Sequence, residues 1–116
     1  MWDERININV SAIDYENTSH EIISTLKNLE KMVHGGNDFI VTDSDFAFGW
    51  HFYVVCINKD LVQKLSDQMG PSFDKIKGRG LEKKFLTWLT DKLVQKQLKV
   101  KLAIKEEMES SKYGIF

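Results

Sequence analysis

Residue types that mark specialised proteins are scarce in this chain of 116 residues. It contains one cysteine, so an internal disulfide is excluded, and one proline. No apolar run approaches the roughly 20 residues that cross a bilayer, and no basic segment followed by an apolar core opens the chain. We therefore expect a cytoplasmic protein that spans no membrane, with Cys56 as a small buried thiol.

Sequence motifs for catalysis and cofactor binding are also missing. The chain has no GxSxG nucleophile motif, no GxxxxGKS/T or GxGxxG phosphate loop, and no Cys or His pair at zinc spacing. These absences argue against serine hydrolases, against nucleotide enzymes that use such loops, and against zinc domains. We expect a protein that is not an enzyme and that needs neither a cofactor nor a metal.

What the chain does contain is the composition of a folded globular protein. Hydrophobic residues make up 42% and charged residues 28% of the sequence. A length of 116 residues is typical of one domain that buries a core without disulfides. We expect a single domain over residues 1–116, with a flexible C-terminal tail at residues 106–116.

Hydrophobic periodicity predicts the order of helices and strands. Thr18 and Glu21 have the spacing of a capping box, which predicts that the first helix begins beside Thr18. Helices are expected at residues 19–33, 60–69 and 81–96, and strands at residues 6–12, 39–42, 46–57 and 98–104. The resulting order, β-α-β-β-α-α-β, is typical of a ferredoxin-like α+β fold, with an antiparallel-rich sheet covered by helices on one face.

The long strand at residues 46–57 predicts which side chains face the helices. One row of alternating positions is continuously apolar and is expected to pack under the helices: Phe46, Phe48, Trp50, Phe52, Val54 and Cys56. The other row places His51 and Tyr53 on the open face of the sheet. Together with Lys99 and Lys101 from the last strand, they would form a polar, aromatic and partly basic surface that binds a partner or lies in solvent.

Charge is unevenly distributed along the chain, although the formal net charge is only −1. Residues 75–105 contain ten basic and two acidic residues, whereas residues 1–58 contain three basic and nine acidic ones. A concentrated field of this kind attracts a charged partner and speeds its association. We expect the contact to include the basic cluster before and within the third helix, namely Lys75, Lys77, Arg79, Lys83 and Lys84.

Trp88 lies within the same basic segment, four residues from Lys84 and four from Lys92. Its ring is a candidate anchor for a partner, and the alternative is a tryptophan at the boundary of the core, beside Phe85 and Leu89.

Two acidic residues offer alternative interpretations. Asp43 and Asp45 are typical of a hairpin turn. As an acidic contact surface they would instead imitate phosphate and occupy the basic surface of a nuclease. With His51 nearby they are also candidates for the ligands of a metal-dependent hydrolase, which is the least favoured hypothesis.

Nucleic acid is the alternative partner for the basic segment, because clustered cations gain affinity by releasing counterions from phosphates. The run Phe46-Ala47-Phe48 is similar to the aromatic part of an RNA-recognition motif. However, Ser44 and Asp45 stand where a basic residue and a glycine are expected, and Phe46 and Phe48 are expected in the core.

A further resemblance concerns the run from Phe48 to Tyr53 and the later Gly70-Pro71 pair, followed by Asp74-Lys75. This combination resembles the aromatic strand and the glycine-proline turn of some bacterial toxin-immunity proteins. The spacing after Gly70 differs from theirs and a long helix stands where a strand would be expected, so neither fold nor site residues are carried over. The resemblance implies a class, namely small cytoplasmic proteins that bind and block another macromolecule.

The leading hypothesis is therefore a small non-enzymatic binding protein that inhibits or neutralises a macromolecular partner through a charge-polarised surface. The partner is expected to be a protein, such as a toxin, a defence factor or a nucleic-acid enzyme, and the open sheet face would also permit a homodimer. A nucleic-acid-binding domain is the first alternative.

Overall fold

A computed structural model describes Trp2 and residues 4–105. The flexible tail expected at residues 106–116 lies outside these described residues. The elements of the fold are β1 (Arg5–Ala12), α1 (Tyr15–Met32), β2 (Phe39–Val41), β3 (Asp45–Ala47), β4 (Trp50–Asn58), α2 (Lys59–Met69), α3 (Pro71–Asp74), α4 (Gly80–Gln95) and β5 (Val100–Ile104).

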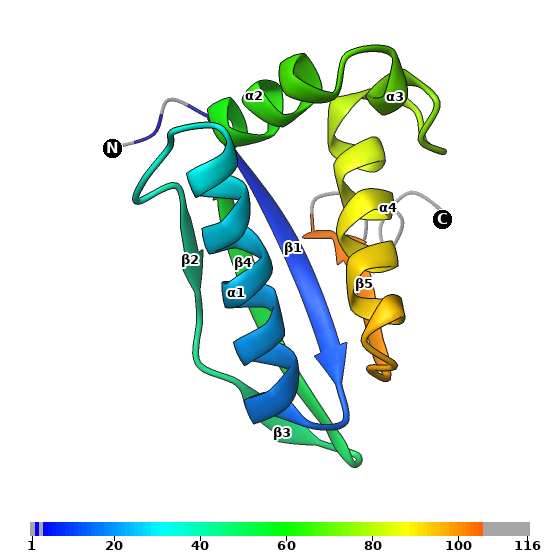
Figure 1. Ribbon diagram of the computed structural model, residues 1–116. Helices are drawn as coiled ribbons and strands as arrows, with labels where there is room; N and C mark the ends of the chain where they lie inside the picture. Colours follow the sequence, from blue (N-terminus) through cyan, green and yellow to red (C-terminus); the bar gives the residue numbers. More distant parts are fainter. Residues whose placement is uncertain (1, 3, 106–116) are drawn as a thin grey trace, which may run out of the picture.

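The strands form one antiparallel sheet with the order β2-β4-β1-β5, and β3 extends the edge formed by β2 because it also pairs with β4. The helices lie on one face of this sheet, with α1 and α4 crossing it and α2 and α3 at one end (Figure 1). The protein is thus a single α+β domain, as the sequence predicts. The element order agrees with the expected β-α-β-β-α-α-β, except that the short helix α3 is added and the strand position beside β4 is divided between β2 and β3.

The core lies between the sheet and the two long helices. Strand β1 buries every second residue from Ile6 to Ala12, as its alternating sequence predicts. Helix α1 contributes Ile22, Leu26 and Leu29, and α4 contributes Phe85, Leu89 and Leu93, all at helical spacing.

Helix α1 begins earlier than the capping-box spacing predicts. Asp14 is the N-cap, and its side chain accepts hydrogen bonds from the backbone N–H of Asn17 (3.1 Å) and from the Asn17 amide (2.8 Å). Thr18, the expected cap, is instead buried within the helix, with 1% of its surface exposed. Both Asp14 and Thr18 are residue types that can cap a helix, and each has a polar residue three positions later. The capping-box spacing alone therefore did not locate the start of α1.

The long strand expected at residues 46–57 is interrupted. Phe48 and Gly49 adopt positive φ angles of 54° and 82° and connect β3 to β4 as a two-residue hairpin. Positive φ at both central residues is the signature of the type I′ turn, whose twist matches that of the flanking strands. Because β3 turns back on β4 here, an apparent strand of twelve positions becomes two strands and a tip.

The predicted assignment of faces on this strand is wrong. Tyr53, Val55 and Ile57 lie under the helices with at most 4% of their surfaces exposed. From the row expected in the core, Phe52 lies on the open face and is 40% exposed, and Phe48 lies in the turn and is 98% exposed. Phe46 pairs with His51 and therefore shares the helix-covered side with it, yet 66% of its surface is exposed. Both rows of β4 are apolar, so alternation could not distinguish them. The register with β1 decides, because it pairs the buried Ile8 and Val10 with Val55 and Tyr53.

Candidate functional site

The face of the sheet that the helices leave open carries an apolar and aromatic strip on β4. Trp50, Val54 and Cys56 are half-buried there, and Phe52 is exposed. The register places Asn7, Asn9 and Ser11 of β1, Lys101 and Ala103 of β5, and Ile40 of β2 on the same face. Cys56 is a free thiol on this face and not the buried core residue that the sequence predicts.

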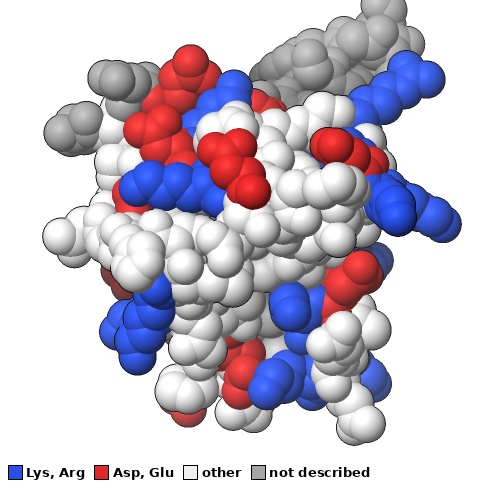
Figure 2. All heavy atoms as spheres, turned by 45° about the horizontal axis from the view of Figure 1, so that its top comes forward, with Lys and Arg blue, Asp and Glu red and all other residues white. Residues whose placement is uncertain are grey.

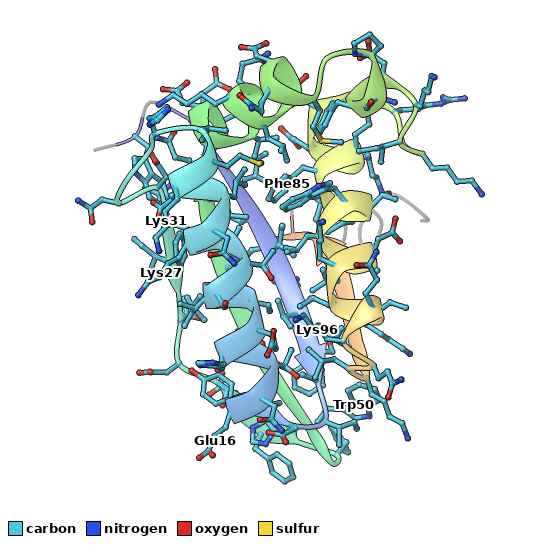
Figure 3. All side chains as sticks on the ribbon, in the orientation of Figure 1. Glu16, Lys27, Lys31, Trp50, Phe85 and Lys96 are labelled. Carbon is cyan, nitrogen blue, oxygen red and sulfur yellow. The ribbon has the colours of Figure 1, made fainter. Side chains whose placement is uncertain are left out.

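The β3–β4 hairpin continues from this strip and exposes aromatic side chains on both of its sides. Phe48 occupies the tip and is 98% exposed, while Phe46 on β3 is 66% exposed. The hairpin lies at the end of the molecule where α1 begins (Figure 1), and Figure 3 shows Trp50 and Glu16 on different sides of this same end. Two phenylalanines that contribute little to the core are therefore presented on one projecting turn. We call Phe46, Phe48, Trp50 and Phe52 the aromatic hairpin.

His51 and Tyr53, expected on the open face, support the base of this hairpin from the helix-covered side. The His51 ring lies 4.8 Å from Phe46 and 5.9 Å from Tyr15, measured between ring centroids, and its Nδ1 lies 3.3 Å from Ser44 Oγ. Tyr15 also meets the edge of Tyr53 at 5.0 Å. The expectation that His51 and Tyr53 form part of an open binding face is therefore corrected: they position the hairpin and do not project from it.

The hydroxyl of Tyr53 is buried and has no hydrogen-bond partner among the described residues. Burial is the main cause that raises the pKa of Tyr53, and the neighbouring Tyr15 adds to it. A phenol held neutral in this way does not act as an acid or a base near neutral pH.

Opposite charges flank the aromatic hairpin. Asp45 stands opposite Phe52 in the β3–β4 register, and a shallow pocket on this side is lined by Asp43, Asp45 and Phe52 among others. On the other side the Nζ of Lys101 lies 5.6 Å from the centroid of the Trp50 ring, a cation–π contact. The exposed Lys99 immediately precedes β5. The surface is thus acidic beside β3 and basic beside β5.

The basic segment that stands out in the sequence does not form one patch. Lys75, Lys77 and Arg79 are exposed in the loop before α4, whereas Lys99 and Lys101 follow its far end. Helix α4 has 16 residues and therefore separates the two groups by about 24 Å. On the face that Figure 2 shows, lysine and arginine side chains are interspersed with aspartate and glutamate.

Two members of the expected basic cluster have structural contacts. Lys84 donates hydrogen bonds from Nζ to the carbonyl oxygens of Asp74 (2.8 Å) and Ile76 (2.6 Å), so it holds the loop before α4 in place. Lys83 is half-buried, and its backbone and Cβ lie against Gly78. These two residues stabilise the loop from which Lys75, Lys77 and Arg79 project.

Trp88 lies at the boundary between core and surface. This position is the alternative that the sequence left open to an exposed anchor for a partner. Its ring stacks on Phe85 with centroids 5.6 Å apart, and the Nζ of Lys92 lies 5.5 Å from its centroid. It lines a groove between α1 and α4 on the helical side of the molecule.

The residues considered for metal chemistry do not converge. Within Trp2 and residues 4–105, no group of three or more His, Cys, Asp or Glu side chains is placed to hold a metal ion. Asp43 and Asp45 flank Ser44, the residue that His51 contacts.

Across the same part of the chain, none of the helices combines the length and apolar character that crossing a bilayer requires.

Comparison of the chain with protein-family models, curated proteins and solved structures finds no match. The functional interpretation therefore depends on the residues themselves.

Sequence reasoning missed the aromatic hairpin because it assigned all four of its aromatic side chains to the core. One signal could have revealed it: Gly49 divides a run too long for a typical strand, and glycine at the second turn position favours a two-residue hairpin.

Proposed function

We propose that this protein is a small non-enzymatic binding protein that blocks a protein partner by inserting its aromatic hairpin into an apolar pocket of that partner. The observation that carries the proposal is Phe48, a large apolar side chain that is 98% exposed at the tip of a projecting turn. Aromatic residues buried at the centre of an interface commonly contribute most of its binding energy.

The backbone at Phe48 strengthens this interpretation. A φ of 54° is uncommon for any residue with a side chain and is a genuine outlier for a bulky one, whereas asparagine or glycine adopts it readily in such a turn. Phenylalanine therefore costs stability here and gains no burial in return. Strained positions of this kind cluster where a protein binds something.

The charges beside the hairpin favour a protein over a nucleic acid. Asp43 and Asp45 lie beside Phe52 and would repel phosphates, but they suit a partner whose pocket has a basic rim. This corresponds to the acidic contact surface considered from the sequence. The basic loop with Lys75, Lys77 and Arg79 lies at the opposite end of α4 and is not part of this contact.

The proposal is tested by placing a photo-crosslinking amino acid at position 48 in cells of the native host. We expect one specific adduct that is absent when the same amino acid replaces Lys64, an exposed residue on α2. With the purified partner, Phe48→Ala should weaken binding at least 30-fold, and the neutralising variant Asp43→Asn with Asp45→Asn should slow association.

Two results would overturn the proposal. Adducts of equal yield at positions 48 and 64 would mean that the tip contacts nothing specifically. A partner bound equally well by the Phe48→Ala variant would mean that the contact lies elsewhere. An adduct with twice the mass of the chain would identify the partner as a second copy.

Single-stranded nucleic acid is a second candidate, and one observation favours it. Trp50 and Phe52 lie on an open antiparallel sheet with the Lys101 ammonium over the Trp50 ring, an arrangement suited to base stacking beside a phosphate. Fluorescence anisotropy of labelled oligonucleotides at about 50 and 200 mM salt tests it. Binding that falls steeply between these concentrations and that Lys101→Gln weakens would replace the protein-partner proposal.

A further inference from the structure

A groove on the helical side of the molecule is separate from the aromatic hairpin. It lies between the second half of α1 and the second half of α4, and its volume is about 320 Å³. This is near the lower end of the range for sites that hold small molecules. Because the helices cover the opposite face of the sheet from Phe52 and Trp50, the groove and the hairpin can be occupied at the same time (Figure 1).

The groove has an apolar base. Leu29 of α1 is buried, and Trp88 of α4 is half-buried against Phe85, which points from α4 toward α1 (Figure 3). Met32 forms part of the lining and is 45% exposed. Methionine and tryptophan present polarisable surfaces that adapt to ligands of different shape. An apolar body placed here would cover side chains that now face solvent.

The charged residues of the lining are all basic. Lys92 of α4 and Lys96, the C-cap of this helix, are four positions apart, and within Trp2 and residues 4–105 no aspartate or glutamate lines the groove. Neither lysine forms an ion pair within 4 Å with any described residue, and the Lys92 ammonium lies over the Trp88 ring instead. Cations near the end of a helix also stabilise its dipole, but this does not account for the apolar surface next to them.

We propose that this groove binds an amphipathic carboxylate, a small molecule with an apolar body and one acid group. The body would cover Leu29, Met32 and Trp88, and the carboxylate would lie between the ammonium groups of Lys92 and Lys96. Two cations at this spacing favour an anion over a neutral ligand of the same shape. The side-chain amides of Asn28 and Gln95 supply further polar groups at the rim.

The test uses decanoate as the ligand and decanol as a matched neutral molecule. Replacing Trp2 and Trp50 with phenylalanine leaves Trp88 as the single tryptophan, so its emission reports the groove directly. We expect a saturable change in Trp88 emission with decanoate and at least tenfold weaker binding of decanol.

Variants then identify the charged contacts. Lys92→Gln combined with Lys96→Gln should weaken decanoate binding at least tenfold and leave decanol binding unchanged. The matched control is Lys27→Gln combined with Lys64→Gln, two exposed lysines away from the groove, which should leave decanoate binding unchanged. The Phe48→Ala variant should also bind decanoate normally, because this site does not depend on the hairpin.

The proposal is overturned if decanoate causes no saturable change, or if decanol binds as tightly as decanoate. It is equally overturned if the control lysine variant loses as much affinity as the groove variant, since the effect would then be one of net charge. All four lysines are exposed, so these variants are expected to fold.

Discussion

At the scale of single residues, Phe48 combines an unfavourable backbone conformation with almost complete exposure. Replacing it with asparagine creates the Asn-Gly pair that type I′ turns prefer. We predict that Phe48→Asn raises the free energy of unfolding by about 1 kcal/mol, because the left-handed conformation costs a bulky L-residue about that much. Urea denaturation monitored by circular dichroism measures the change.

A matched control lies two positions away. Phe46 is also exposed, but its φ angle is not positive, so Phe46→Asn should give no gain in stability. Equal stabilisation by both variants would show that the removal of apolar surface, and not the turn conformation, is responsible.

Tyr53 gives a second prediction at this scale. Its buried hydroxyl has no partner among the described residues, and an unsatisfied buried polar group costs about 1–3 kcal/mol. We predict that Tyr53→Phe leaves the free energy of unfolding unchanged or raises it by up to about 1 kcal/mol at pH 7. A loss of more than about 1 kcal/mol in chemical denaturation would instead mean that the hydroxyl is satisfied.

The same residue predicts a dependence on alkaline pH. Burial raises the pKa of Tyr53 above the value of about 10 that an unfolded chain has. The unfolded state therefore loses its proton first, and the stability of the fold falls as the pH rises above about 10. Denaturation curves at pH 9 and 11 should show a smaller loss for Tyr53→Phe than for the native protein, by about 1 kcal/mol. Parallel losses in both proteins would contradict this assignment.

At the scale of secondary-structure elements, the N-cap of α1 can be tested. Asp14 satisfies the backbone N–H of Asn17, and loss of an N-cap side chain typically costs about 1 kcal/mol. We predict that Asp14→Ala lowers the free energy of unfolding by this amount in urea denaturation. Glu21→Gln serves as the control, because Glu21 does not form the capping box that its spacing with Thr18 predicts.

The elements also show why part of the fold is readable from the sequence. Strand β1 alternates apolar and polar residues strictly, so its period and its buried face could both be predicted. The ranges of α2, α4 and β5 are confirmed to within two residues, because each has a clear period and a clear break. In β4 both faces are apolar, so the sequence predicts the strand but not its orientation.

The reversed faces of β4 also explain why the sequence did not predict the aromatic hairpin. Once Phe46 and Phe48 are assigned to the core, no exposed aromatic surface remains to be found. The short helix α3 was missed for a different reason: four residues contain too little periodicity to predict a helix.

At the scale of the whole molecule, the strands of the sheet should differ in how well their amide hydrogens are protected from exchange with solvent. Strands β1 and β4 are paired on both sides, whereas β2, β3 and β5 lie at the edges. We predict that amide hydrogens of β1 and β4 exchange most slowly and that those of β2 and β3 exchange faster by at least an order of magnitude. Hydrogen exchange followed by NMR tests this, and equal protection in β1 and β2 would contradict the strand order.

The basic residues that are consecutive in the sequence do not form one surface in the folded molecule. Along the chain, residues 75–105 form a continuous basic segment. In the fold, helix α4 separates the two ends of this segment, and Lys84 donates hydrogen bonds to carbonyl oxygens of the preceding loop. Counting charges along the sequence does not reveal this separation, because the separation arises from the helix that lies between the two groups of basic residues. The function inferred from that segment stays a prediction.

The two-residue turn at Phe48 and Gly49 has a consequence for how such a protein evolves. Phe48 is almost wholly in solvent, so its side chain is uncoupled from the packing of the core, whereas the φ of 82° at Gly49 favours glycine there. Under the proposed function, a substitution at position 48 would change the target while the core stays packed, so the remainder of the domain would act as a scaffold for new specificities.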